Sequence, residues 1–144
     1  MSNLLVQNIK HTNNTTSMAI DTSGQVTIRG EGSATTTNLQ QGLAKCWINF
    51  DGSGTIATRD SFNVSGITDD ATGRYTVSIN NDMANDDYAV LNYTSGSTNS
   101  SATAFNNNFL GGNNLQTSTF AISAYAADFE DSDMVMAQVT GDLA

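Results

Sequence analysis

The 144-residue chain contains no proline, one cysteine and one histidine. A single cysteine excludes an intrachain disulfide, and a zinc site needs several cysteine or histidine ligands, which the count also excludes. Basic residues are scarce, because five Lys and Arg stand against 14 Asp and Glu, for a net charge of −9. This balance argues against nucleic acid and anionic membrane surfaces as partners.

The sequence also lacks any apolar run long enough to span a membrane. Its first residues have neither the basic start nor the apolar stretch of a signal peptide, so we expect the chain to be made and folded in a cytoplasm. The lone Cys46 lies on the apolar face of an alternating run. We expect it to be a small buried hydrophobe rather than a reactive thiol.

Large apolar side chains are scarce as well. Leu, Ile, Val and Phe make up about a fifth of the residues, near the lower limit for a folded chain. Two explanations of this low apolar content remain open. Either part of the chain is disordered, or other copies of the same chain complete the core. Regular strand patterns favour the second explanation, and we therefore expect self-association.

Small polar residues dominate the composition. Asn, Ser and Thr are abundant, and nearly all the acids are Asp. These side chains compete with the helical backbone for hydrogen bonds, so we expect an all-β chain. Tyr75, Val77 and Ile79 alternate with polar residues, and 44–50 alternates in the same way. A period of two is typical of a half-buried strand.

The second part of the chain consists of such runs at regular spacing, separated by turn-forming clusters of Asp, Gly and Ser. The predicted strands are 44–50, 55–59, 61–67, 74–79, 88–94, 119–125 and 134–140. Short strands with frequent turns predict an antiparallel β-sandwich or small barrel over residues 43–144.

The chain before residue 43 divides into two parts. Residues 1–29 hold apolar pieces too short to enclose a core and predict an N-terminal arm that lies on another surface. Residues 30–42 are small and polar and predict a flexible linker. The apolar side chains expected to anchor the arm are Leu4, Val6, Ile9, Met18 and Ile20.

Candidates for catalysis or metal binding are few. His11 lies in a polar stretch, and no serine–aspartate pair can be assigned to it. The acidic run 128–133 offers hard oxygen ligands for calcium but lacks the glycine and spacing of an EF-hand. A solvated connection between two strands is the other interpretation of this run. We expect no enzyme activity, no cofactor and no metal site.

Aromatic residues are the better candidates for binding. Trp47 falls on the strand face opposite Ala44 and Ile48, while Phe105 and Phe109 lie in an otherwise polar loop. These three aromatic residues are candidate contacts to a partner surface or a receptor. The alternatives are that Trp47 packs in a subunit interface and that the two phenylalanines pin their loop.

Two parts of the sequence resemble a known family. The segments Leu5–Asn13 and Thr15–Val26 resemble the N-terminal start of many tailed-bacteriophage fibre and appendage proteins. A second set of segments resembles a β domain common near the ends of those fibres: Ala44–Gly52, Arg59–Asp69, Gly73–Val77 and Asp87–Val90.

The resemblance implies a homotrimeric virion protein, assembled in the host cytoplasm, whose arm binds other virion proteins of the tail, neck or capsid. Its β domain would lie outermost and contact a glycan or protein of the host surface. The implied function is a short tail fibre or similar appendage involved in host attachment. Family members usually carry a long shaft, and here only the linker stands in its place. A capsid-decorating or head-fibre protein, anchored to the shell by the arm, is therefore the alternative.

Overall fold

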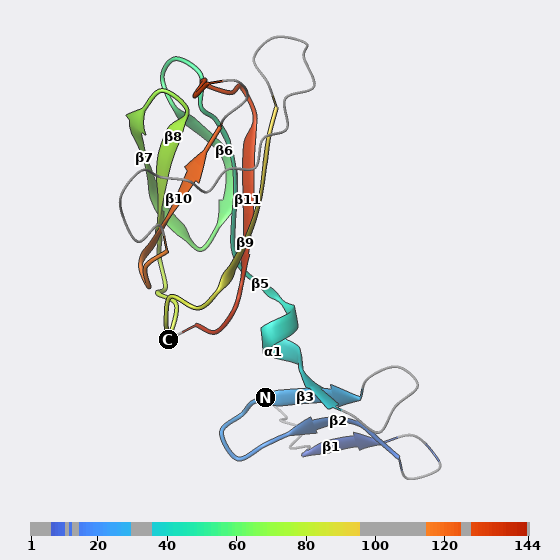
Figure 1. Cartoon of the computed structure of the whole chain (residues 1–144). Helices are drawn as coiled ribbons and strands as arrows, with labels where there is room; N and C mark the ends of the chain where they lie inside the picture. Colours follow the sequence, from blue (N-terminus) through green and yellow to red (C-terminus); the bar gives the residue numbers. More distant parts are fainter. Residues whose placement is uncertain are drawn as a thin grey trace, which may run out of the picture. The chain divides into compact units, whose positions relative to one another are not determined.

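The structure is a computed structural model, and it describes residues 7–10, 12, 15–29, 36–95, 115–124 and 128–143. Within these residues the chain is all-β, with one single-turn helix (Figure 1). The predicted fold class is confirmed. The chain divides into two compact units, which we call the N-terminal unit (Met1–Leu43) and the sandwich unit (Ala44–Ala144).

The N-terminal unit is a four-stranded antiparallel sheet whose strands follow one another in chain order. They are β1 (Asn8–Lys10), β2 (Thr16–Ile20), β3 (Val26–Arg29) and β4 (Thr36–Asn38). Asp21 shapes the turn between β2 and β3, because its Oδ1 accepts hydrogen bonds of 2.8 Å from the backbone N–H groups of Ser23 and Gln25. Gly24 supplies the positive φ of 79° that this turn requires.

The second half of the stretch predicted as a linker has regular structure. Strand β4 pairs with β3, and residues Leu39–Gly42 form helix α1. Asn38 caps the helix, since its side chain accepts a 2.8 Å hydrogen bond from the backbone of Gln40. The prediction of a linker over 30–42 is therefore wrong from residue 36 onward. Residues 30–35 lie outside the described residues.

The sandwich unit contains two separate antiparallel sheets rather than a closed barrel. One has the order β6-β5-β11-β9 and the other β10-β8-β7. The strands are β5 (Ala44–Asp51), β6 (Ala57–Phe62), β7 (Val64–Ala71), β8 (Arg74–Ile79), β9 (Ala89–Thr94), β10 (Thr119–Ser123) and β11 (Val135–Thr140). Each coincides with a predicted strand to within a few residues.

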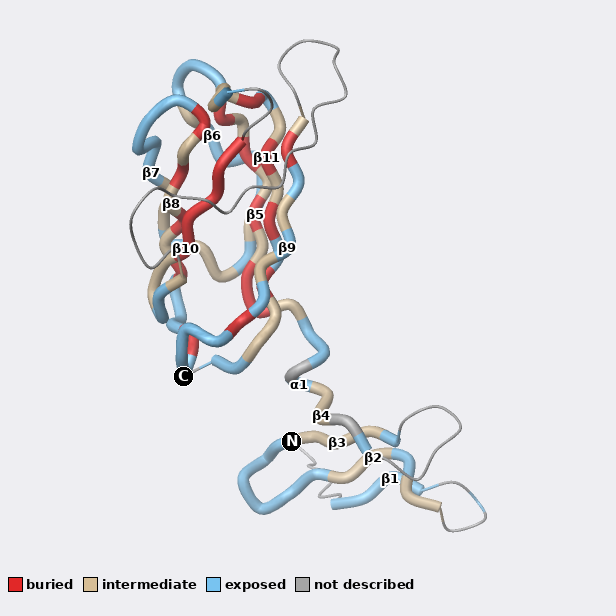
Figure 2. The backbone as a smooth tube through the Cα atoms, in the orientation of Figure 1, coloured by how far each residue is buried: buried red, intermediate tan, exposed pale blue. Residues whose placement is uncertain are grey.

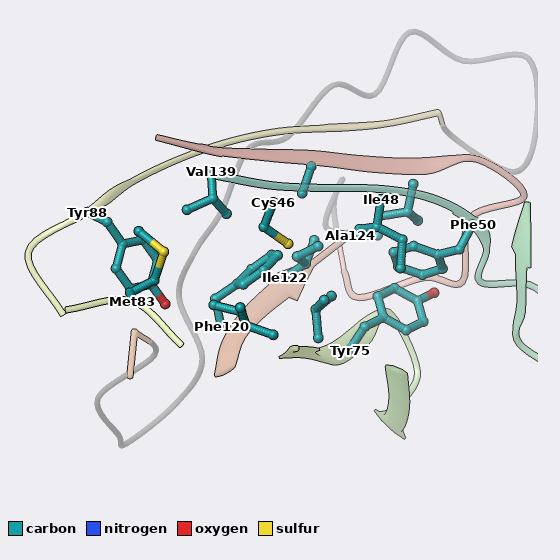
Figure 3. Close-up of a cluster of buried hydrophobic side chains, with 14 residues drawn as sticks. Cys46, Ile48, Phe50, Tyr75, Met83, Tyr88, Phe120, Ile122, Ala124 and Val139 are labelled. Carbon is teal, nitrogen blue, oxygen red and sulfur yellow. The ribbon is translucent and has the colours of Figure 1, made fainter. Parts of the chain in front are cut away.

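Inward-facing side chains of both sheets form one core (Figure 3). Phe50 of one sheet meets Tyr75 of the other edge to face, with ring centroids 5.1 Å apart. Cys46 is fully buried in this core, and burial raises the pKa of its thiol to about 11. The fully buried apolar side chains include Cys46, Ile48, Phe50, Tyr75, Val77, Phe120, Ile122, Val135 and Val139.

Asn63 forms the corner at which the chain leaves one sheet for the other. It has a positive φ of 56° between β6 and β7. Its Nδ2 donates to the carbonyl of Lys45 at 2.9 Å, and its Oδ1 accepts from the backbone of Asn81 at 2.8 Å. Asparagine suits this corner because it tolerates the left-handed conformation and bonds to nearby backbone.

Candidate functional site

One face of the N-terminal sheet is apolar. The register pairs Ile9 with Met18 and Met18 with Ile28, and it pairs Ile20 with Val26. Directly paired residues of neighbouring strands point to the same side of a sheet. These five side chains therefore share one face, which we call the anchor face. The opposite face holds Asn8, Ala19, Thr27 and Asn38.

The anchor face has no core beneath it within the described residues. Ile9 is 53% exposed and Ile20 is 36% exposed. Before Ala44, no residue whose burial the structure describes is buried, and Figure 2 shows the buried positions in the sandwich unit. A sheet with one apolar face must cover that face with another layer.

The structure brings together three of the five predicted anchor residues, Ile9, Met18 and Ile20. Leu4 and Val6 lie outside the described residues. Val26 and Ile28 complete the face, and they were not among the predicted anchor residues. Val26 and Ile28 alternate with polar residues, which is visible in the sequence. Their place beside Met18 depends on the register between strands, which is not.

A second apolar surface lies on the outer side of the four-stranded sheet of the sandwich unit. The register sets Phe62, Trp47, Gln138 and Leu91 in one row across β6, β5, β11 and β9. The next row holds Asp60, Asn49, Met136 and Tyr93. We call these eight residues the outer face.

The outer face is accessible along its length. Leu91 is 68% exposed, Phe62 53% and Tyr93 39%, while Trp47 and Met136 are partly exposed. Trp47 thus lies on the outward side of its strand, where the alternation of the sequence places it. Phe105 and Phe109, the other candidate contacts, lie outside the described residues.

Asn49 carries an unusual polar atom on this face. Its Oδ1 is buried and has no hydrogen-bond partner among the described residues. An unpaired buried acceptor destabilises a protein by about 1–3 kcal/mol.

The acidic run 128–133 is held by hydrogen bonds to the rest of the sandwich. Asp131 Oδ1 accepts a 2.7 Å hydrogen bond from the backbone of Gly73. The Ser132 hydroxyl donates to the carbonyl of Ser95, and Asp133 accepts a 2.6 Å hydrogen bond from the Ser95 hydroxyl. These contacts favour the interpretation of the run as a structural connection.

Groups suited to catalysis or metal binding do not converge. Across the parts of the chain that the structure describes, no three His, Cys, Asp or Glu side chains gather as metal ligands would. Asp51 pairs with Arg59 at 3.3 Å, and hydrogen bonds from Ser53 lower the pKa of its carboxyl. His11 lies outside the described residues.

None of the helical segments described is long and apolar enough to cross a bilayer. Comparisons of the chain with protein-family models, with curated proteins and with solved structures give no match. The anchor face and the outer face are the two exposed apolar surfaces of the described residues from which a function can be inferred.

Proposed function

We propose that this chain is a non-enzymatic structural protein of a tailed-phage virion, a short tail fibre or similar appendage involved in host attachment. The anchor face is the observation that carries the proposal. Among the residues whose burial the structure describes, the N-terminal sheet has none that is buried, and it precedes a sandwich that has its own core. An exposed apolar face of this kind is typical of a surface that binds another protein.

The sequence resemblance supports the same division of roles. The segment that resembles the start of phage fibre proteins, Leu5–Val26, supplies Ile9, Met18, Ile20 and Val26 of the anchor face. The segments that resemble the outer fibre domain fall in the sandwich unit. The N-terminal unit would bind other virion proteins, and the sandwich unit would face outward.

The proposal includes a homotrimer, assembled in the host cytoplasm and located in the virion. Additional copies of the chain, or the virion surface, would cover the apolar side chains that one copy leaves exposed. The outer face, with Trp47, would contact the host surface. With a net charge of −9, neither nucleic acid nor an anionic membrane is a partner in this proposal.

A capsid-decorating or head-fibre protein is the second candidate. The connection between the two units favours it, because only α1 and Leu43 separate strand β4 from strand β5. A helix of four residues is about 6 Å long and does not extend the sandwich unit away from its anchor as a shaft would. Such a short connection suits a protein that lies close to a shell.

A matched pair of substitutions on β3 tests the proposal. Ile28→Asp places a charge on the anchor face, whereas Thr27→Asp places the same charge on the opposite face. We expect Ile28→Asp to reduce the amount of the chain in purified virus particles at least tenfold, and Thr27→Asp to reduce it less than twofold, as measured by quantitative mass spectrometry.

The thermal unfolding of the sandwich unit serves as a control and should be the same in both variants. Equal incorporation of the two variants would contradict the assignment of the anchor face. The number of copies per particle separates the two candidates, because a tail appendage is present in a few to some dozens of copies and a decorating protein follows the symmetry of the shell.

A further inference from the structure

We propose that the N-terminal unit folds as it docks, so that its four strands are open in the free chain and form their sheet only against a partner surface. The inference rests on the proposed function and extends it, because it says how the anchor face is kept inactive before the particle is built. It depends on the single layer of the unit, on the exposure of its hydrogen bonds and on its turns.

The N-terminal sheet is a single layer in the part of the chain that the structure describes. Among the residues before Ala44 whose burial is described, none is buried, and the buried positions in Figure 2 belong to the sandwich unit. A sheet becomes stable in water when its apolar face packs against a second layer. The strands have only three to five residues each. Their partial burial does not offset the entropy lost when the chain is ordered.

The side-chain hydrogen bonds described in this unit are exposed to water. They include the two that Asp21 accepts in the turn between β2 and β3 and a 3.1 Å bond from Asn38 Nδ2 to Gln25 Oε1. In the sandwich unit, by contrast, the Tyr75 hydroxyl bonds to the carbonyl of Gly52 in the interior. A hydrogen bond that water can replace adds little to stability. These bonds therefore do not hold the sheet together by themselves.

The turns nevertheless specify which sheet forms. Asp21 and Gly24 shape the turn that joins β2 to β3, and the hairpin pairs Met18 with Ile28. Turn geometry sets the register of a hairpin. The open chain thus needs few further contacts to reach the correct register once a partner covers the anchor face, and the unit is poised to fold on that partner.

Folding on docking would prevent premature association of the free chain. A preformed anchor face would present Ile9, Met18 and Ile20 as one apolar patch to every other protein in the cytoplasm. An open segment presents no such patch. Docking then includes the cost of ordering the segment, which lowers its affinity but restricts stable binding to a surface that covers the whole face.

Hydrogen–deuterium exchange of the full-length chain, measured by mass spectrometry, tests the state of the free unit. Strands β2 and β3 have neighbours on both sides, so that a stable sheet would protect their amides. We expect these amides to exchange within about tenfold of the rate of an unstructured peptide of the same sequence, and those of β5, β8 and β11 about a thousandfold more slowly. In purified particles, exchange in β2 and β3 should be about a hundredfold slower than in the free chain.

Two glycine variants test the coupling of folding to docking. A Cβ added at Gly24 or at Gly42 meets nothing within 4 Å, but only Gly24 has a left-handed φ, of +79°. If the turn forms on docking, the strain in Gly24→Ala weakens docking in full, by about tenfold. If the sheet is preformed and stable, the same strain lowers its stability and leaves docking unchanged.

The variants are compared by competition. Equal amounts of wild-type and variant chain are present while particles assemble, and the ratio in purified particles is measured by mass spectrometry. Gly24→Ala should be about tenfold under-represented. Gly42→Ala, the matched control, should be incorporated like the wild-type chain.

Three results would overturn the inference. They are protection of β2 and β3 in the free chain, exchange in particles as fast as in the free chain, and equal incorporation of the two glycine variants. The proposed function fails separately, if the wild-type chain is missing from virus particles, because exchange in the free chain is measured without particles.

Discussion

The hydroxyl of Tyr75 donates a 3.1 Å hydrogen bond to the backbone carbonyl of Gly52, 23 residues earlier in the chain. The same hydroxyl accepts a 3.4 Å hydrogen bond from the backbone of Ser132, and Ser132 in turn accepts one of 2.8 Å from Gly52. Three distant segments of the sandwich unit thus meet at one phenol. This contact holds the acidic run against both sheets.

The close approach of Tyr75 makes glycine necessary at position 52. A Cβ added to Gly52 would lie 2.6 Å from Cζ of Tyr75, which is far inside van der Waals contact. We expect Gly52→Ala to lower the free energy of unfolding by about 1–3 kcal/mol. Gly66→Ala is the matched control, because a Cβ there meets nothing within 4 Å. Denaturant unfolding, followed by Trp47 fluorescence, measures both, and equal stability of the two variants would contradict the packing described.

Ionisation of buried phenols should destabilise the sandwich unit at high pH. Burial raises the pKa of Tyr75 and of Tyr88 to about 12, from an ordinary value of 10.0. The folded chain therefore keeps protons that the unfolded chain loses above pH 10. The free energy of unfolding should be independent of these groups below about pH 9 and fall between about pH 10 and 12, by about 2 kcal/mol for each phenol.

Tyr75→Phe provides the comparison for this pH dependence. At pH 7 the free energy of unfolding of the variant should be about 1 kcal/mol lower than that of the wild-type chain, because a hydrogen bond to a buried carbonyl is lost. Above pH 10 its free energy of unfolding should fall less steeply than that of the wild-type chain. Unfolding curves at intervals of half a pH unit measure the slope. A slope equal to that of the wild-type chain would show that Tyr75 does not titrate as a buried group.

The thiol of Cys46 should be inert in the folded chain. It is fully buried, and burial raises its pKa to about 11, so that both access and thiolate formation are suppressed. We expect a thiol reagent such as dithionitrobenzoate to label Cys46 at pH 8 only at the rate of opening of the sandwich unit. Labelling should be complete within seconds in denaturant, and rapid labelling without denaturant would contradict the burial.

Self-association should be independent of the anchor face. The full chain is expected to sediment as a trimer of the 15.2 kDa subunit. Ile28→Asp and Thr27→Asp should both remain trimers, because the anchor face is the surface proposed to bind other virion proteins. A loss of Ile28→Asp from particles would then report the contact with the virion and not the assembly of the trimer. A monomeric wild-type chain at micromolar concentration would contradict the trimer.

The strands of the sandwich were predictable from the sequence because alternation is a local signal. Tyr75, Val77 and Ile79 show their inward face without any knowledge of their neighbours. The linker prediction failed at residues 36–42 because Thr and Asn also form strands and caps when a partner strand is present. Strand β3 provides that partner for β4, and the sequence alone does not show the pairing.

The candidate surfaces were predictable only in part, for a related reason. Trp47 could be assigned to an outward face from its own strand, but its neighbours come from elsewhere in the chain. Gln138 lies beside it through the pairing of β5 with β11, and Leu91 joins through the pairing of β11 with β9. Phe62 joins across a hairpin that contains a bulge, which shifts the register between Asn49 and Phe50.

We propose that this chain belongs to a virus particle and is attached through its N-terminal unit. Electron microscopy of purified particles, with a gold label on the C-terminus of the chain, is the decisive test of this attachment. We expect label on the particle at the tail, and label over the shell would favour the capsid-decorating candidate. Particles without label, from a lysate that contains the labelled chain, would contradict the attachment to the particle.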